Sequence, residues 1–183
     1  MVRRAKQRII ENGCLYMYET ENLNEKEDIM RRKTITFTSE KIEYIKERAI
    51  EFNKLLVFAN YTGQVHAIAK ALEDDGHIVF TLTGQTKDRA VTIQKAEESP
   101  KCVIVAQCTI SAGYELPSFP CVVFASLNWQ SLHHIQAKGR VLRANKLKKN
   151  LYIYLVVKDK GSVDRDCYNA IMSGANFNEK VFE

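Results

Sequence analysis

The sequence predicts an α/β domain whose mainly parallel central sheet is covered by helices on both faces. From residue 39 onward, short apolar runs alternate with longer amphipathic stretches that have the period of a helix. Strands and helices that alternate in this way are joined by right-handed crossovers and form a parallel sheet. With 45% hydrophobic and 27% charged residues among 183, the composition is that of one compact globular domain and excludes disordered or low-complexity chains.

The first half of the domain is predicted from periodicity and from helix-ending residues. Apolar residues recur on one helical face after Ser39, which is a suitable N-cap, and Gly76 is a C-terminal stop for the second helix. Thr86 is a candidate N-cap for the third helix, which must end before Pro100. The predicted elements are a helix over 39–52, a strand over 54–59, a helix over 62–75, a strand over 77–82 and a helix from 86.

The second half continues the same alternation after an irregular loop. That loop contains Gly113, Pro117 and Pro120, which disfavour regular structure. The predicted elements are strands over 102–106, 121–125 and 151–157, and helices over 131–142 and 164–172.

Residues 1–38 do not follow this alternation and are interpreted as a lead-in from a preceding domain, with 39–183 as the main domain. A helix over 3–12 would end at Gly13, and strands over 14–20 and 34–38 would flank a charged loop over 21–33. Two strands joined in this way suggest a hairpin appended to the domain.

Charge is distributed unevenly along the chain. Formal net charge is only +5, yet no acidic residue lies between Glu115 and Asp159. The basic residues in that stretch are Lys138, Arg140, Arg143, Lys146, Lys148, Lys149 and Lys158. An uncompensated basic stretch attracts anions, which favours a nucleotide or nucleic-acid partner over the alternative of a solvated basic face.

Several other classes of function are disfavoured. The longest apolar run, Leu151 to Val157, is too short to span a membrane, so we expect no membrane contact and a cytoplasmic location. A compact chain with short loops suits a bacterium or a phage-infected cell. The cysteines are scattered and odd in number, as expected for buried thiols in a reducing compartment. His133 and His134 have no cysteine or carboxylate at ligand spacing, so we predict no metal site.

The segment QAKGRVLR carries the clearest candidates for phosphate chemistry. Arg140 and Arg143 are three residues apart on a predicted helix, so both guanidinium groups can reach one point, and Gln136 lies one turn earlier. Two planar guanidinium groups suit a multiply charged phosphate. The chain has no G-x-x-x-x-G-K-[ST] and no G-x-G-x-x-G, so it lacks the phosphate-binding loop of a complete nucleotide hydrolase.

Two further segments that follow predicted strands are suited to phosphate. The loop QCTISAGYELP offers hydroxyl groups, a glycine and an acid, although an ordinary strand-to-helix loop is the alternative. After the strand LLVFA, Thr62 and Gly63 open a helix whose N-terminus favours an anion. Trp129 could stack on a base, but a lone aromatic residue more often closes the edge of a domain.

In their order and spacing, these segments resemble the second RecA-like lobe of superfamily 2 helicases and translocases, which include DEAD/H-box and Swi/Snf-type enzymes. The resemblance runs from about Ile42 to Val157. LLVFANYT resembles motif IV, LTGQTKDR the strand that follows it, QCTISAGYELP motif V and QAKGRVLR motif VI. It implies a three-layer RecA-like domain of the P-loop NTPase type.

The resemblance also implies roles for residues. Arg140 and Arg143 would be arginine fingers at an ATP and Mg²⁺ site held mainly by a preceding N-terminal lobe of the same protein. The implied nucleotide-binding or coupling residues are Gln136, Gly139, Gly113 and Glu115. The implied nucleic-acid contacts are Thr62, Gly84, Arg89, Gln107, Thr109, Lys138 and Lys146.

Two positions depart from the pattern of the family. Gln107 stands where many members have Thr or Ser, which puts its backbone-contact role in doubt. Gln136 replaces a histidine common in DEAD-box members, which favours DNA, with RNA as the alternative.

Two rival functions stay open at this stage. The chain could be a stand-alone nucleic-acid-binding or protein-interaction module that hydrolyses nothing. A small-molecule nucleotide-binding enzyme is disfavoured by the absence of a glycine-rich loop after a strand.

Overall fold

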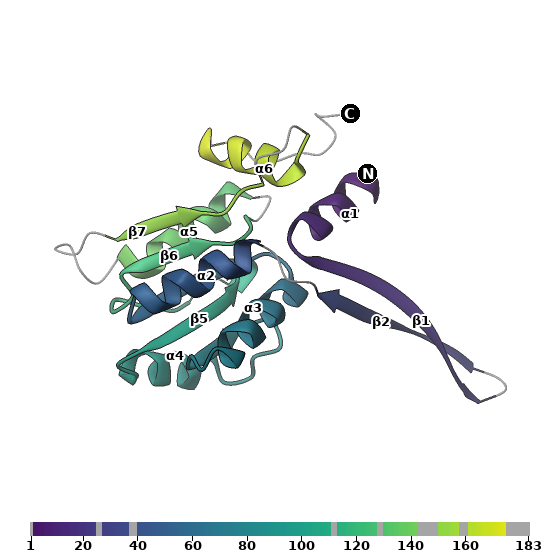
Figure 1. Cartoon of the computed structure of the whole chain (residues 1–183), viewed down its shortest axis with the longest axis horizontal. Coiled ribbons are helices and arrows are strands. Elements are labelled where there is room, and N and C mark those ends of the chain that lie inside the picture. Colours follow the sequence, from purple (N-terminus) through teal and green to yellow (C-terminus); the bar gives the residue numbers. More distant parts are fainter. Residues whose placement is uncertain are drawn as a thin grey trace.

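A computed structural model describes residues 2–24, 27–36, 40–110, 113–127, 130–142, 150–157 and 161–174. The side chains of residues 2, 18–32 and 142 are not described. The chain forms a layered α/β domain from which an N-terminal hairpin projects (Figure 1).

The central sheet has five strands, all parallel, in the order β4-β5-β3-β6-β7. The strands are β3 (Lys54–Ala59), β4 (Val79–Leu82), β5 (Cys102–Gln107), β6 (Cys121–Phe124) and β7 (Leu151–Tyr154). β3 lies at the centre, where Leu56 pairs with Ile104 of β5 and with Val122 of β6. The predicted parallel sheet is confirmed, and the carboxyl ends of all five strands lie at one edge.

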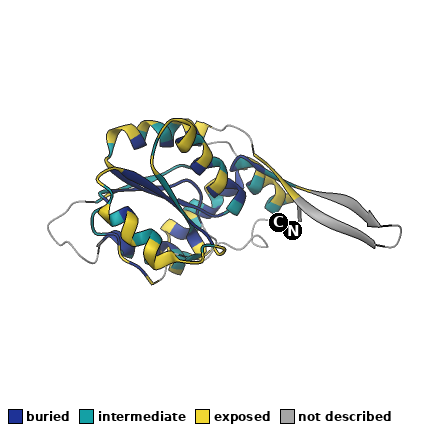
Figure 2. Ribbon diagram, turned by 90° about the horizontal axis from the view of Figure 1, so that it is seen from below, coloured by how far each residue is buried: buried dark blue, intermediate teal, exposed yellow. Residues whose placement is uncertain are grey.

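Helices cover both faces of the sheet, as predicted. The helices are α2 (Glu40–Glu51), α3 (Thr62–Asp74), α4 (Arg89–Glu98), α5 (Ser131–Leu142) and α6 (Val163–Met172). Alternate residues of β3 belong to two apolar clusters: Leu55 packs with α2 and α3, whereas Leu56 packs with α4, α5 and α6. Figure 2 shows the resulting three layers, with buried strands between helices whose outer faces are exposed. The fold is the predicted three-layer RecA-like arrangement.

The N-terminal region consists of α1 (Val2–Glu11) and an antiparallel hairpin of β1 (Cys14–Asn24) and β2 (Glu27–Thr36). The stop at Gly13 is present, with φ at 75°. The predicted charged loop over 21–33 is wrong for most of its length, because β1 runs to Asn24 and β2 starts at Glu27. Charged residues do not oppose strand formation where a two-stranded ribbon leaves a face open to water.

Two smaller predictions also differ from the structure. Thr86 does not cap α4, which begins at Arg89; its hydroxyl oxygen accepts from the Thr83 N–H at 2.9 Å and closes the turn after β4. β7 ends at Tyr154 instead of residue 157, where its pairing with β6 stops. Ser39, the predicted cap of α2, lies outside the described residues.

All the cysteines are buried and none forms a disulfide, as predicted. In the described part of the chain, no helix combines the length and apolarity needed to cross a membrane.

Candidate functional site

Four of the predicted nucleic-acid contacts lie beyond the carboxyl ends of three neighbouring strands. Thr62 follows β3, Gly84 follows β4, and Gln107 and Thr109 lie at the end of β5. The structure therefore brings them to the edge where open α/β sheets bind ligands. Gly84 and Thr109 are exposed, and so is Arg89 at the start of α4.

Arg140 joins α5 to the loop after β5. Its Nη1 donates to the Tyr114 carbonyl at 3.0 Å and its Nε to the Gln136 carbonyl at 3.2 Å. In the reverse direction, the Leu116 N–H donates to the Arg140 carbonyl at 2.9 Å. The helix and the loop, predicted as separate motifs, are thus held together by hydrogen bonds that run both ways.

The guanidinium group of Arg140 retains capacity for an anion. A guanidinium group has five N–H donors, of which two are used by the Tyr114 and Gln136 carbonyls. Its carbon lies 6.0 Å from the centre of the Tyr114 ring, and the residue is only 8% exposed. Burial raises the pKa of the Tyr114 phenol, so the ring beside this cation is neutral.

The outward face of α5 carries the other described residues of this motif. Gln136 and Gly139 are partly exposed there, beside the exposed side chains of Leu132 and Ile135. A Cβ added at Gly139 would meet no atom within 4 Å, so packing within this lobe does not require a glycine.

Three predicted residues of the basic stretch have different outcomes. The Lys138 ammonium lies 4.9 Å from the centre of the Tyr152 ring, which leaves it at the surface of the lobe. Arg143 and Lys146 lie outside the described residues, so the predicted convergence of Arg140 and Arg143 stays a prediction.

The loop after β5 exposes both residues that were predicted to couple nucleotide to nucleic acid. Gly113 has φ of 88°, a conformation that requires glycine, and Glu115 is exposed two residues later. Gln107 differs, since it is half-buried and its Nε2 donates to the Asn60 carbonyl at 3.4 Å. Its side chain therefore contacts the end of β3.

Gly63 serves the packing of the hairpin against α3. A Cβ at this position would lie 2.6 Å from Thr34 Cγ2 and 3.3 Å from Cys14 Sγ. The base of the hairpin therefore sits directly against the helix N-terminus that the sequence suggested for an anion. Thr62 stays partly exposed beside it.

Sequence reasoning missed a buried ion pair that joins α2, α6 and the N-terminal helix. Lys41 Nζ lies 2.7 Å from Asp164 Oδ2 and also donates to the Ala125 carbonyl at 2.9 Å. Burial lowers the pKa of Lys41, and the charge of Asp164 opposes this effect. Glu11 of α1 accepts from the Asp164 N–H at 3.1 Å, at the start of α6.

A second missed group of polar residues lies at the strand ends. Ser126 Oγ donates to Gln64 Oε1 at 2.6 Å and accepts from the Asn60 N–H at 2.7 Å. Asn60 comes directly after β3, and Ser126 follows β6 after the buried Ala125. This contact could have been predicted from the sequence, because polar residues that follow parallel strands come together at the carboxyl edge of the sheet.

Of the tandem histidines, His134 has a structural role in the core. His134 is 8% exposed, packs 4.9 Å from the Phe124 ring, and its Nε2 lies 3.3 Å from the Tyr154 hydroxyl. Burial lowers its pKa to about 4, with a smaller effect from Lys138, so the imidazole is neutral. Within the described residues, no three His, Cys, Asp or Glu side chains gather as metal ligands. Trp129 lies outside those residues.

Comparison with known proteins shows which family and which solved structures this chain is similar to. Residues 40–145 match the family described as helicase conserved C-terminal domain. No curated protein sequence matches the chain. Among solved structures, it is similar to the C-terminal part of the Fun30 ATPase domain, with a TM-score of 0.68 and 20% identity over 79% of this chain and 50% of that chain.

Two other solved structures share the fold. The C-terminal domain of the DEAD-box protein Dbp5 matches with a TM-score of 0.62 and 21% identity, over 74% of this chain and 78% of that chain. The Pyrococcus furiosus Hef helicase domain matches with a TM-score of 0.58 and 24% identity, over 71% of this chain and 28% of that chain. The chain thus spans half of the Fun30 chain and less than a third of the Hef chain.

Proposed function

This chain belongs to the helicase conserved C-terminal domain family, and from that premise we propose that it is the second motor lobe of an ATP-dependent helicase or translocase. The strand it moves along would be nucleic acid, with DNA expected. Its first lobe would carry the phosphate-binding loop that this sequence lacks.

The observation that carries the proposal is the two-way bonding between α5 and the loop after β5. Arg140 donates to the Tyr114 carbonyl and accepts, through its own carbonyl, from the Leu116 N–H. A helix that faces nucleotide and a loop that faces nucleic acid would then move as one body. This is the mechanical link that a motor needs between hydrolysis and its grip on the strand.

The nucleotide side of the proposal rests on Arg140, Arg143 and Gln136. The unused N–H donors of Arg140 fit a phosphate group, whose oxygens accept hydrogen bonds from a planar guanidinium group. ATP, when bound, supplies the phosphoryl group that is transferred to water. Arg140 and Arg143 would stabilise the negative charge of the phosphoryl oxygens in the transition state. Mg²⁺ would be held by the first lobe.

The nucleic-acid side rests on the exposed residues at the strand ends. Thr62, Thr109 and the backbone at Gly84 and Gly113 would contact phosphates, with Arg89, Lys138 and Lys146 supplying positive charge. Such contacts hold a strand without reading its sequence. Gln107 contributes less directly in this proposal, because its amide is bonded to Asn60. Glu115, in the loop after β5, would couple the bound nucleotide to the nucleic-acid contacts of that loop.

The experiment compares this chain alone with the protein that contains both lobes. The single lobe should show no ATP turnover and bind ATP with a dissociation constant of about 1 mM or weaker, because half of the phosphate contacts are missing. The two-lobe protein should hydrolyse ATP faster when single-stranded nucleic acid is added. Robust ATP turnover by the single lobe would refute the proposal. So would a two-lobe protein whose rate of ATP hydrolysis does not change when nucleic acid is added.

A further inference from the structure

Buried hydrogen bonds begin at the end of α1 and lead toward the site. The side-chain amide of Asn12 donates to the Arg8 carbonyl at 2.8 Å. Its side-chain oxygen accepts from Lys41 Nζ at 2.9 Å and from Gln64 Nε2 at 3.2 Å. Asn12 is 2% exposed, so water does not compete for these bonds. The N-terminal helix is therefore bonded directly to α2 and α3.

From Gln64 the bonds cross the carboxyl ends of three neighbouring strands. Ser126, after β6, joins Gln64 to the Asn60 N–H after β3. The Asn60 carbonyl then accepts from Gln107 Nε2 at the end of β5. Cys108 Sγ makes a second connection, 3.4 Å from the Ser126 carbonyl, at the start of the short helix Cys108–Ile110 that carries Thr109.

The network has a fixed direction at its central amide. Gln64 uses its nitrogen toward the Asn12 side-chain oxygen and its oxygen toward Ser126, so turning the amide over would place two oxygens against each other at Asn12 and break that bond. Gln64 is 3% exposed and Ser126 is 1% exposed. If one of these hydrogen bonds is lost, its buried donor or acceptor has no water to replace the missing partner. Because an unpaired buried polar group is unfavourable, the neighbouring groups rearrange to restore the bond.

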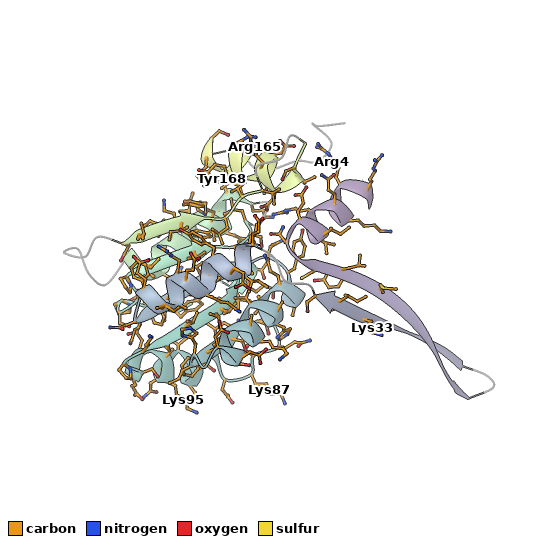
Figure 3. All side chains as sticks on the ribbon, in the orientation of Figure 1. Arg4, Lys33, Lys87, Lys95, Arg165 and Tyr168 are labelled. Carbon is orange, nitrogen blue, oxygen red and sulfur yellow. The ribbon has the colours of Figure 1, made fainter. Side chains whose placement is uncertain are left out.

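The N-terminal helix is itself fixed to the body of the domain. Gln7 Nε2 donates to the Gly161 carbonyl at 3.0 Å, Arg4 lies 3.5 Å from Asp166, and the Ser162 hydroxyl donates to Glu11. Figure 3 shows the labelled Arg4 of α1 on the side of that helix that faces α6. Force applied to α1 therefore reaches both α6 and the buried network.

We propose that Asn12, Gln64 and Ser126 are positioning residues through which the N-terminal helix sets the geometry of the loop after β5. Displacement of α1 changes the bonding of Asn60 and Gln107, and with it the position of Thr109. The lead-in is then a working part of the lobe, and it conveys movement of whatever is joined to α1. The coupling depends only on bonds within this chain; its effect on nucleic acid rests on the proposed function.

The test is nuclear magnetic resonance of the whole chain, with the Gln107 side-chain amide as the spectroscopic signature. Asn12→Ala should shift that resonance and speed the exchange of the Gln107 side-chain protons and of the Cys108 and Thr109 amides by about tenfold. The matched control is Asn150→Ala, because Asn150 also donates to a carbonyl near a helix end, that of Val141, at 3.1 Å. The control should leave Gln107 unchanged. No change at Gln107 in Asn12→Ala would overturn the proposal.

A double-mutant cycle shows whether the effect passes through Ser126. In a Ser126→Ala background, Asn12→Ala should add nothing to the shift at Gln107, because the link is already cut. An equal and additive shift would overturn the proposed route. Should Asn12→Ala fail to fold, Gln64→Glu removes the donor to Asn12 but keeps an acceptor for Ser126, and the same shift at Gln107 is expected.

Nucleic-acid affinity separates this proposal from the proposed function. Asn12→Ala should weaken the binding of single-stranded DNA by the chain several-fold, with the Asn150→Ala variant unchanged. A shifted Gln107 resonance without a change in affinity would overturn the nucleic-acid part and leave the coupling standing. If the wild-type chain bound no DNA, the proposed function would fail independently of the network.

Discussion

Removing the negative charge at Asp164 is expected to destabilise the lobe strongly. Lys41 and Asp164 have side-chain exposures of 11% and 3%, and their charged atoms are 2.7 Å apart. In the Asp164→Asn variant, the ammonium of Lys41 loses its counter-ion in a buried position but keeps its bonds to the Asn12 side chain and the Ala125 carbonyl. Breaking one partner of a buried pair costs about 3–5 kcal/mol.

A loss of that size corresponds to a fall in melting temperature of roughly 6–20 °C for a domain of this length. The assay is urea unfolding at pH 7, followed by circular dichroism. The matched control is Asp74→Asn, because Asp74 forms an exposed pair with Lys70 in which the two side chains are 62% and 75% exposed. Asp74→Asn should unfold at the same urea concentration as the wild type. Equal stabilities of the two variants would refute the inference of a buried charge pair.

The same variant has a signature in its pH dependence. Burial already lowers the pKa of Lys41 in the folded protein, so between its folded and unfolded pKa values the unfolded state binds more protons. Stability from this group therefore rises with pH as Lys41 loses its proton in the folded state. Without Asp164 that pKa falls further, and the deficit of Asp164→Asn relative to wild type should shrink between pH 7 and pH 9.5. A constant deficit would contradict the assignment to the Lys41 charge.

Three other predictions follow from the hairpin contact, the basic stretch and His134. Gly63→Ala should lower the free energy of unfolding by about 1–3 kcal/mol, because its Cβ would lie 2.6 Å from Thr34 Cγ2. The control Gly139→Ala should change it little, since a Cβ there meets no atom within 4 Å, and equal urea midpoints of the two variants would contradict the prediction. DNA affinity of the chain should fall by roughly one to three orders of magnitude between 50 and 200 mM salt if three to five phosphates are neutralised, and Lys148→Ala should reduce that slope in a fluorescence titration. Burial lowers the pKa of His134 to about 4 in the folded protein, whereas the unfolded chain takes up a proton at this residue below about pH 6.5. Stability should therefore fall progressively as the pH drops from about 6.5 to 4, and His134→Gln should flatten acid unfolding in that range.

The sheet and its helices follow from periodicity that is local in the sequence. Lys54–Ala59 is buried throughout, as a continuous apolar run predicts, and Val65, Ile68 and Leu72 face the core at helical spacing. The hairpin was underestimated because its charged residues resemble a loop, while strand pairing depends on main-chain bonds that residue type does not reveal. His134 was predictable as core, since it shares a helix face with the buried Ala137 and Val141.

The site was predicted as separate motifs, and their connections could not be. The partner of Arg140 is the carbonyl of Tyr114, a group that every residue type carries. The buried network joins Asn12, Gln64 and Ser126, which lie far apart in the sequence and come together only once the fold is formed. Each of these polar residues alone looks like an ordinary turn or helix residue.

The most direct measurement of the motor proposal is ATP turnover by the two-lobe protein at saturating nucleic acid, with Arg140→Lys and Arg143→Ala compared to wild type. Each variant should lower kcat by about 10³ with little change in KM, because an arginine finger acts on the transition state and an ammonium does not reproduce the planar guanidinium group. The control Lys95→Ala removes an exposed positive charge from α4 and should retain full turnover. Near-wild-type kcat in both arginine variants, with unchanged melting temperatures, would contradict the account of this lobe as half of an ATP-driven motor.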